Sequence, residues 1–250
     1  MFGFIPKNFL VCPFWEEEMP FVCGVDGCRK GWIVICKEME SSSVSPHLCS
    51  SAQAFFDFRP SLVAIDIPIG LPERGSRMCD VEARKLLGPA RKSSIFPAPI
   101  RPILNAKNYK EACAIRLQFE GKKLSLQTWG IVPKIKEVDK LLRENPHLRN
   151  SIREVHPEVS FYFLGGNKPL QLNKKTKDGQ MERYALLKPI FGHWLDQVLS
   201  QRNQLGSGVD DVLDAFAALW SAERIFKGES QSLPSLPVAD SFGLRMEILA

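Results

Sequence analysis

Residues 61–70, SLVAIDIPIG, form an apolar run that ends in a proline and a glycine. A strand that is apolar on both faces lies in the middle of a sheet covered on both sides, because a half-exposed strand alternates apolar and polar residues. A single carboxylate, Asp66, interrupts the run near its end. The sequence therefore predicts a covered sheet with an acidic side chain where one central strand stops.

An acidic residue also ends the first apolar run, in FVCGVDGCRKGW at residues 21–32. An unpaired carboxylate is costly in free energy when it is buried, so Asp26 must be solvated, paired or bound to a metal. Residues 21–27 and 31–37 are typical of two strands joined by a glycine-containing turn, which predicts a hairpin. Ligands gather at the C-terminal ends of strands in open sheets, so Asp26 and Asp66 are candidate site residues.

The rest of the chain is mainly helical in pattern. Helices are predicted over 51–58, 79–87, 107–119, 133–144, 181–201 and 209–226, and a strand leading into a short helix over 151–164. Pro133 suits the first turn of its helix. This order indicates an α/β or α+β fold. We expect a single domain over residues 21–250 with an insertion at about 88–150, preceded by an N-terminal extension at 1–20.

Composition excludes several classes of protein. The chain is 44% hydrophobic and 24% charged, as globular proteins are, and no run of about 18 apolar residues predicts a membrane span. Residues 1–18 contain two prolines and lack a basic start, so a signal peptide is not expected. Seven cysteines without a CxxC pair favour a reducing compartment, and we expect the cytoplasm.

Positive charge is concentrated in one part of the chain. Residues 74–123 hold twelve Lys or Arg and four Asp or Glu, a net +8 within a chain of net +5. A basic segment of this kind favours a phosphate-rich partner such as nucleic acid. The simpler alternative is a solvated surface.

The last predicted helix carries further acids, in GVDDVLDAFAALW. Asp211 and Asp214 are three residues apart and therefore lie on one helical face. Capping of the helix start explains Asp210 and one further acid, because the N-terminus of a helix favours negative charge. Capping does not explain Asp214, which lies in the second turn among apolar residues. We therefore interpret Asp211 and Asp214 as site residues.

The segment REVHPEVSF adds Glu154, His156 and Glu158. Glu154 and His156 would point to the same side of a strand, because side chains alternate. We assign His156 to proton transfer at a leaving group, Glu154 to metal binding, and Glu158 to catalysis or metal binding. The alternative is a helix that starts at Pro157 beside a hydrogen-bonded histidine.

Several carboxylates in one place cannot all ionise without a compensating positive charge. Mg²⁺ or Mn²⁺ suits a donor set of oxygens with one candidate histidine better than Zn²⁺ does. Two such ions about 3.5–4 Å apart would activate a water and stabilise the leaving oxygen of a phosphodiester.

Seven segments together resemble one known family. GVDGCRKGW, AIDIPIGLP, CDVEARKLLG, SSIFPAP, PKIKEVD, EVHPEVSF and DDVLDAFAALWSA occur in order between about residues 21 and 226. They resemble the bacterial and archaeal domain-of-unknown-function family 429, described as predicted ribonuclease-H-like nucleases. The resemblance implies a mixed five-stranded sheet with antiparallel first strands and helices on both faces.

The resemblance also implies which acids form the site. In nucleases of the ribonuclease-H-like superfamily, such as Holliday-junction resolvases, an acid on the first strand matches Asp26. An acid at the end of the fourth strand matches Asp66. An acid pair at the start of the last helix matches Asp211 and Asp214.

The leading hypothesis is therefore a metal-dependent nuclease that hydrolyses the phosphodiester bonds of DNA or RNA. The predicted phosphate contacts are Arg29, Lys30, Arg77, Arg84, Arg91 and Lys92. One alternative is an ATP-dependent phosphotransferase of the sugar-kinase or actin-like type, although the chain has neither a glycine-rich adenosine loop nor an internal duplication. Another is a nucleic-acid-binding module with an inactive site. Cleavage of junctions would favour a homodimer.

Overall fold

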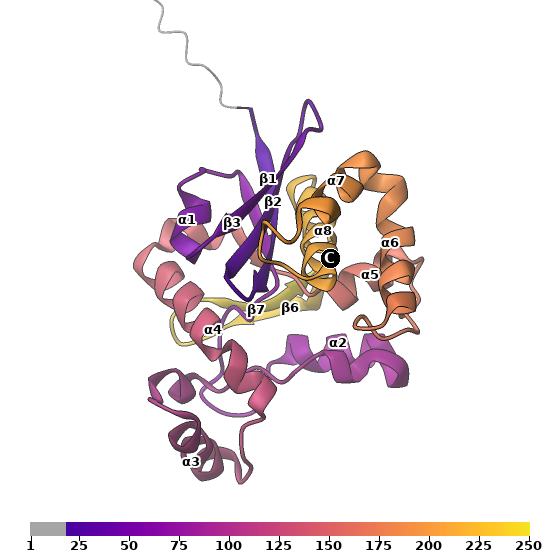
Figure 1. Cartoon of the computed structure of the whole chain (residues 1–250). Helices are drawn as coiled ribbons and strands as arrows, with labels where there is room; N and C mark the ends of the chain where they lie inside the picture. Colours follow the sequence, from indigo (N-terminus) through magenta and orange to yellow (C-terminus); the bar gives the residue numbers. More distant parts are fainter. Residues whose placement is uncertain (1–18) are drawn as a thin grey trace, which may run out of the picture.

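The computed structural model describes residues 19–250, so the predicted extension at 1–20 lies almost wholly outside the described residues. Five strands form one mixed sheet in the order β3-β2-β1-β4-β5 (Figure 1). They are β1 (Phe21–Cys28), β2 (Gly31–Glu38), β3 (Val44–Cys49), β4 (Leu62–Ile65) and β5 (Ile152–Glu154). β2 pairs antiparallel with β1 and β3, whereas β4 pairs parallel with β1 and β5. The predicted α/β fold with a ribonuclease-H-like sheet is confirmed.

Helices cover both faces of this sheet. They are α1 (Ala52–Phe56), α2 (Met78–Arg91), α3 (Tyr109–Glu120), α4 (Leu126–Glu144), α5 (Pro157–Leu164), α6 (Lys177–Phe191), α7 (His193–Gln201) and α8 (Val209–Phe226). Figure 1 shows α1 and α4 on one side of the sheet and α8, α7 and α6 on the other. A second sheet of two strands, β6 (Ser232–Ala239) and β7 (Arg245–Leu249), contacts α2.

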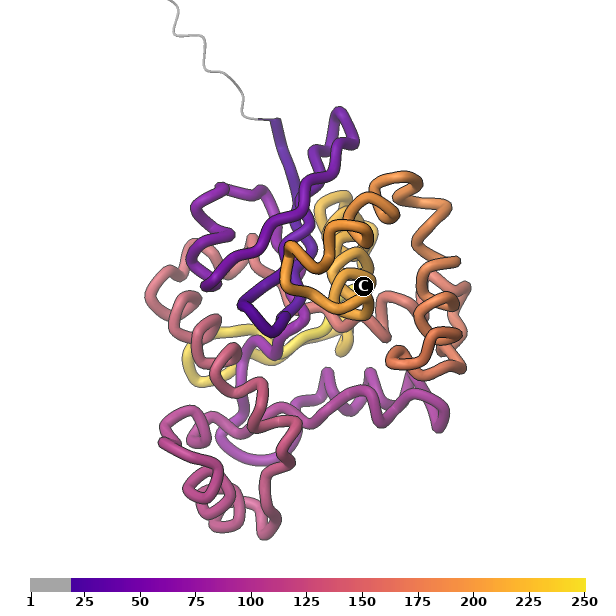
Figure 2. The backbone as a smooth tube through the Cα atoms, viewed as in Figure 1, coloured from indigo at the N-terminus to yellow at the C-terminus, as the bar shows by residue number. Residues whose placement is uncertain are grey.

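The chain between β4 and β5 leaves the sheet for most of its length. It forms α2, α3, α4 and three short 3₁₀ helices, and so contains the region of the insertion expected at about 88–150. The tube in Figure 2 shows that α3 lies at the opposite end of the molecule from the turn between β2 and β3. None of the helices within residues 19–250 is long and apolar enough to cross a membrane.

Several element boundaries differ from the sequence predictions. α4 begins at Leu126, where the side chain of Ser125 accepts a hydrogen bond from the Thr128 amide, so Pro133 lies inside the helix and not in its first turn. The helix predicted over 181–201 is two helices, because Gly192 between them adopts φ 54°. The 209–226 helix is confirmed.

The alternation of side chains along β1 separates two hydrophobic cores. Cys23 and Val25 pack with the α4 side, whereas Val22 packs with the α8 side. Gly24 and Asp26 share the face of Val22, because side chains two residues apart along a strand point the same way. That face of β1 therefore ends in a carboxylate beneath α8.

Gly24 lets α8 approach the sheet closely. A Cβ atom at this position would lie 2.1 Å from the backbone nitrogen of Leu219 and 2.3 Å from the carbonyl oxygen of Ala215. Both are backbone atoms in the middle of a helix, so no side-chain rotation could relieve the clash. The residue at position 24 therefore sets the distance between β1 and α8.

We predict that Gly24→Ala destabilises the protein by about 1–3 kcal/mol, the usual effect of overpacking a core, because α8 must move away from β1. The measurement is the urea midpoint of unfolding, followed by circular dichroism. Gly130→Ala is the matched control: it lies within α4 with open space around its Cβ position, so the same change should be neutral or stabilising. Equal midpoints for Gly24→Ala and the wild-type protein would contradict this account of the interface.

Candidate active site

Asp26 and Asp66 lie side by side at the ends of two parallel strands. Val25 of β1 is the register partner of Ile65 of β4, and the Asp66 amide donates a 2.9 Å hydrogen bond to the Val25 carbonyl. Each acid is the next residue after this pair. Both side chains therefore leave the sheet on the α8 face, as the sequence predicted for two acids at strand ends.

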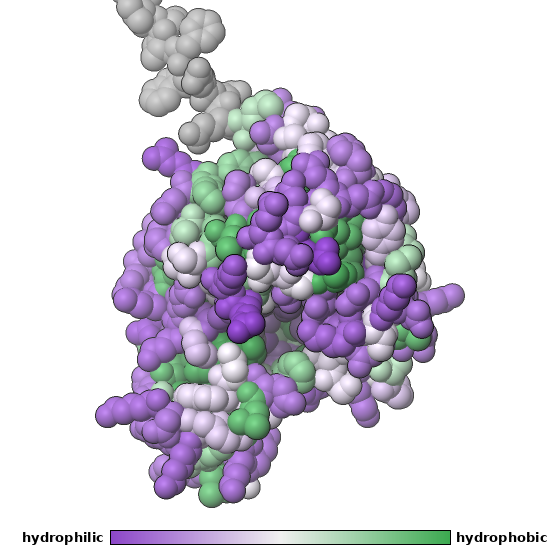
Figure 3. Space-filling model, in the orientation of Figure 1, coloured by the Kyte–Doolittle hydropathy of each residue, from purple (hydrophilic) through white to green (hydrophobic). Residues whose placement is uncertain are grey.

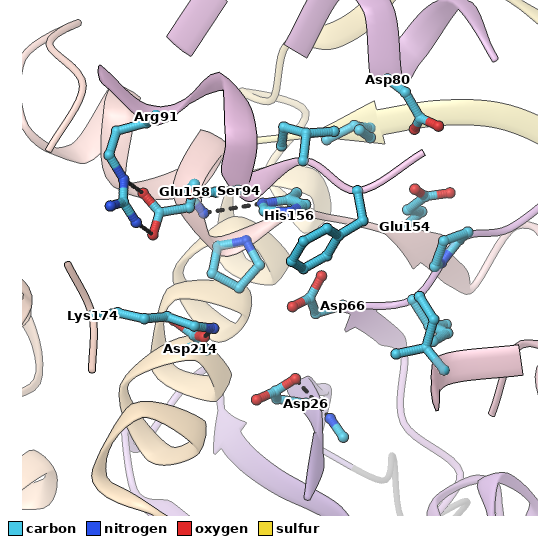
Figure 4. Close-up of a pocket in the computed structure, with 18 of the residues that line it drawn as sticks. Asp26, Asp66, Asp80, Arg91, Ser94, Glu154, His156, Glu158, Lys174 and Asp214 are labelled. Atoms are coloured by element: carbon cyan, nitrogen blue, oxygen red, sulfur yellow. Dashed lines mark hydrogen bonds and ion pairs between the residues drawn. The ribbon is translucent and has the colours of Figure 1, made fainter. Parts of the chain in front are cut away.

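Asp214 reaches the same place from α8. It precedes Ala215, the residue whose carbonyl lies against Gly24, and only 1% of Asp214 is exposed. Lys174 donates to its Oδ2 atom at 2.5 Å, whereas its buried Oδ1 atom has no hydrogen-bond partner among the described residues. Figure 4 shows Asp26, Asp66 and Asp214 around one space, with Lys174 beside Asp214.

This space is a cavity of about 480 Å³. One wall carries the three aspartates and His156, and cationic side chains lie beside them. Apolar residues from the loop after β4, the segment after α2, α4 and β7 also line the cavity. The apolar residues that line the cavity are Ile67, Pro68, Ile95, Phe96, Ile131 and Ile248. The lysines that line it are Lys134, Lys174 and Lys175.

The three aspartates carry more negative charge than their surroundings compensate. Burial raises the pKa of Asp26 well above its usual value, and the charges of Asp66 and Asp214 raise it further, against the opposing effect of Lys174. Burial also raises the pKa of Asp66, which His156 and Lys174 lower in part. Burial raises the pKa of Asp214 to about 6, even beside Lys174. A further cation would stabilise the ionised cluster.

His156 lies on the cavity wall as the N-cap residue of α5. Its Nδ1 atom accepts a 3.2 Å hydrogen bond from the Glu158 amide, so a neutral ring carries its proton on Nε2. The helix start at Pro157 beside a hydrogen-bonded histidine is the alternative considered from the sequence, and it is present. His156 nevertheless remains close enough to Asp66 to lower its pKa.

Glu158 is held in the wall of the cavity by two arginines. Arg91 donates to both of its oxygens, at 3.0 and 2.6 Å, and Arg183 also donates to Oε1. Burial alone would raise the pKa of Glu158, but these arginines hold it below its usual value. The ionised Glu158 carboxylate has arginine hydrogen bonds on both oxygens, and these ion pairs join α2, α5 and α6. Its predicted catalytic or metal-binding role is not supported.

Glu154 faces the opposite side of the sheet from Asp66. It pairs in register with Ile65, whose side chain lies in the α4-side core. Arg77 binds both Glu154 oxygens at 2.7 Å, and the Ile69 amide donates to one of them at 2.6 Å. β5 ends at Glu154, so strand alternation does not extend to His156. Glu154 also lines the cavity, but Arg77 occupies both of its oxygens, which favours a structural role over the predicted role as a metal ligand.

Asp211, and not Asp210 as expected, caps the start of α8. Asp211 Oδ2 accepts a 2.8 Å hydrogen bond from the Gly208 amide, which caps α8, and Asp211 does not line the cavity. Its charge still raises the pKa of Asp26. Asp210 is buried and pairs with Lys175. Of the acid pair predicted for this helix, Asp214 lines the cavity and Asp211 caps the start of the helix.

The predicted phosphate contacts divide into two groups. Arg29, Lys30 and Lys92 are exposed. Arg77 is 3% exposed and bound to Glu154 and Asp80, and Arg84 donates to the Ile95 carbonyl at 2.9 Å. Together with Arg91 on Glu158, these arginines hold the protein's own groups, so their predicted contact with substrate is not supported. Figure 3 shows that hydrophilic residues nevertheless dominate the viewed surface.

The sequence analysis did not place three of the residues that line the cavity: Phe96, Lys134 and Lys174. Lys134 lies 4.1 Å above the Trp32 ring and donates to the Gly31 carbonyl, and burial lowers its pKa. The signal was present, because Phe96 and Lys134 belong to SSIFPAP and PKIKEVD, two of the segments that carried the resemblance. Lys174 had no such signal.

We predict that Asp26→Asn stabilises the protein at pH 7 in metal-free buffer by at least about 1 kcal/mol. A raised folded-state pKa means that stability is lost as pH rises from the unfolded value of about 4 through the raised value, because the folded cluster must ionise. Asparagine removes this loss. The gain in melting temperature should therefore shrink towards pH 4, where the wild-type carboxyl is protonated.

Asp80→Asn is the matched control for that measurement. Asp80 is buried and accepts two hydrogen bonds from Arg77, so the same chemical change should lower the melting temperature by leaving a buried cation short of its partner. An Asp26→Asn protein that melts below the wild type at pH 7 would show that Asp26 has a structural partner.

No group of three or more His, Cys, Asp or Glu side chains within residues 19–250 is arranged so that it could hold a metal ion. The three aspartates therefore share the cavity without forming a completed ligand cage. Lys174 supplies the positive charge that faces them.

Comparison with known proteins identifies the family. No curated protein and no solved structure matches the chain. Residues 24–239 match a family described as "Protein of unknown function (DUF429)", a range that includes the five-stranded sheet after the first residues of β1 and the lining residues of the cavity except Ile248. The chain therefore belongs to domain-of-unknown-function family 429.

Proposed function

We propose that this protein is a metal-dependent phosphodiesterase that hydrolyses nucleic acid. One observation carries the proposal. Asp26, Asp66 and Asp214 converge on a single cavity from two strand ends and a helix, and their pKa values are raised by burial and by neighbouring carboxylates, which Lys174 offsets only in part. Such perturbed, clustered acids in a cavity are typical of functional sites.

The donor types suit a hard divalent cation, although no three of these groups within residues 19–250 are arranged in the structure to hold one. Asp214 Oδ1 is buried without a hydrogen-bond partner among residues 19–250, and the Asp26 carboxylate accepts a 2.7 Å bond from the neighbouring Gly27 amide. Carboxylate oxygens are the ligands that Mg²⁺ and Mn²⁺ prefer. Asp26, Asp66 and Asp214 are the residues that would bind the ion. Asp214 Oδ1 is the oxygen that has no other partner among the described residues.

Bound Mg²⁺ or Mn²⁺ supplies charge that lowers the pKa of an attacking water and offsets the negative charge that develops on phosphate oxygens. The chain's own groups supply the rest. The His156 ring, oriented by the Glu158 amide, carries an Nε2–H group that can donate a hydrogen bond to a leaving oxygen. Lys134 and Lys175 add positive charge at the wall for phosphate. The apolar wall limits the access of other water.

Two observations weigh against the alternatives. A phosphotransferase of the sugar-kinase or actin-like type would need two domains of this kind, and residues 19–250 contain one five-stranded sheet. A binding module with an inactive site would have no need to retain three buried aspartates of raised pKa. We expect the enzyme to act in the cytoplasm, where the cysteines at 23, 28, 36, 49, 79 and 113 would stay free, as they are in the structure.

We predict that the purified protein cleaves DNA or RNA with Mg²⁺ or Mn²⁺, that EDTA stops cleavage, and that Asp26→Asn abolishes it. Asparagine keeps the shape of the side chain but removes the charge of a ligand. The measurement is a gel-based panel of linear and structured DNA and RNA. Asp57→Asn, at an exposed residue beyond α1, is the control and should cleave normally. Full activity of Asp26→Asn on a cleaved substrate would rule out its catalytic role.

We further predict that Lys174→Met strengthens Mn²⁺ binding. Lys174 neutralises Asp214 from within the chain, and its flexible side chain is 36% exposed, so a cation and the ammonium compete for the same charge. Direct titration of Mn²⁺, followed by electron paramagnetic resonance, should show a lower dissociation constant. Metal-free protein should melt lower, because Asp214 loses its partner.

Lys175→Met is the matched control for Lys174→Met. It removes the same charge from the next residue, which pairs with Asp210 and has a side chain that is 70% exposed. Its effect on Mn²⁺ binding should be small, since exposed pairs are screened by solvent. Weaker Mn²⁺ binding by Lys174→Met would mean that Lys174 supports the cation site and does not compete with it.

A further inference from the structure

Phe96 is an exposed aromatic side chain at the wall of the cavity. It is 48% exposed, although it lies between Ile95, which is 1% exposed, and the Pro97–Ala98 turn. A large apolar ring in contact with water has no stabilising role in the fold by itself. A ring at a cavity wall is instead suited to contact a ligand.

The backbone on both sides of Phe96 is fixed by hydrogen bonds. Arg84 donates to the Ile95 carbonyl at 2.9 Å, and the Thr128 hydroxyl donates to the Pro97 carbonyl at 3.2 Å. The Ala98 amide donates to Asp80 at 3.2 Å. The ring is therefore presented on a rigid support, so that little conformational entropy is lost when a ligand packs against it.

The cavity has both apolar and charged lining residues. Phe96, Ile67 and Ile131 lie among the lining residues together with the three aspartates, Lys134 and Lys175. A nucleotide has the same division, because its base is flat and apolar on its faces and its phosphate is anionic. The volume of about 480 Å³ is in the range of small-molecule pockets.

Paired bases cannot use this arrangement. In a duplex both faces of each base are stacked on its neighbours, whereas an unpaired base can be turned out and stacked on an aromatic side chain. A whole duplex, with its bases in the middle of the helix, would also be too wide to bring a base into a cavity of this size. The apolar wall therefore favours a single-stranded substrate.

We propose that the substrate is single-stranded nucleic acid, with one unpaired base stacked on Phe96 while the adjoining phosphodiester lies at Asp26, Asp66 and Asp214. This inference rests on the proposed function and specifies its substrate. Phe96 would be a specificity-determining residue that holds the base and orients the bond to be cleaved, with Lys134 and Lys175 beside the backbone phosphates.

The test measures whether binding depends on the base and on Phe96. Fluorescence anisotropy would compare a labelled oligothymidine strand, an abasic strand of equal length and a blunt duplex, with Ca²⁺ in place of Mg²⁺ to prevent cleavage. Wild-type protein should bind the thymidine strand at least about fivefold more tightly than the abasic strand, the lower end of a base–aromatic stack, and more tightly than the duplex.

Phe96→Leu should lose the preference for the thymidine strand over the abasic one, and Phe96→Trp should keep it. Phe226→Leu, at a ring that is 41% exposed at the end of α8, is the matched control and should behave as the wild type. Equal affinity of the wild-type protein for thymidine and abasic strands would overturn the inference without any variant. Equal affinity for strand and duplex, or displacement of the strand by an equimolar free nucleotide, would also overturn it.

The failure of this inference differs from failure of the proposed function. A protein that cleaves duplexes as readily as single strands, with or without Phe96, is still a phosphodiesterase but does not use Phe96 to hold a base. A protein that binds none of the three probes with Ca²⁺ and cleaves none with Mn²⁺ contradicts the proposed function and this inference with it.

Discussion

The site depends on how closely α8 packs on β1. Gly24 has no side chain, so the backbone of α8 at Ala215 and Leu219 rests directly on the strand. Two residues along β1, on the same face, the strand ends in Asp26. One residue before Ala215, α8 carries Asp214. A bulkier residue at position 24 would separate these carboxylates, so the packing of an apolar core and the assembly of the charged site have the same structural cause.

Around the aspartates, buried ion pairs fix the walls of the cavity. Arg77 joins Glu154 of β5 to Asp80 of α2, and Glu158 of α5 holds both Arg91 of α2 and Arg183 of α6. A buried charge without its partner strongly destabilises a fold, so these pairs constrain the relative positions of the elements that carry them. Arg77 and Arg91 of the basic segment therefore stabilise the site from behind, and their charge is already matched by carboxylates.

The site could be predicted where it depends on neighbouring residues in the sequence, and could not where it depends on residues far apart in the sequence. Asp26 and Asp66 were found because local alternation and an apolar strand determine where each side chain points. Glu154 was misassigned because β5 ends at that residue and pairs with Ile65, so its side chain lies on the other face of the sheet. No pattern in the local sequence shows which residue of β4 pairs with Glu154.

Pairing between distant residues was equally inaccessible. Arg77 and Glu154 are 77 residues apart, Arg91 and Glu158 are 67 apart, and Lys174 and Asp214 are 40 apart. Local sequence shows an arginine as a free cation until its partner is known, which explains why Arg77, Arg84 and Arg91 were expected to face phosphate. The five-stranded sheet was predictable because seven matched segments implied a whole topology, whereas the second sheet of β6 and β7 lay outside those segments.

Lys174 explains how the chain can fold with three aspartates in one cavity. Three carboxylates with raised pKa values would oppose folding at neutral pH, and one ammonium group beside Asp214 relieves part of that repulsion. It does so from a loop residue on a long side chain and not from a helix or strand. The same residue therefore stabilises the aspartate cluster, while Asp214 keeps one oxygen without a partner among the described residues. Glu158 shows what permanent pairing within the chain looks like, because two arginines bind its oxygens. The aspartate cluster differs, because part of its negative charge at the cavity has no positive partner.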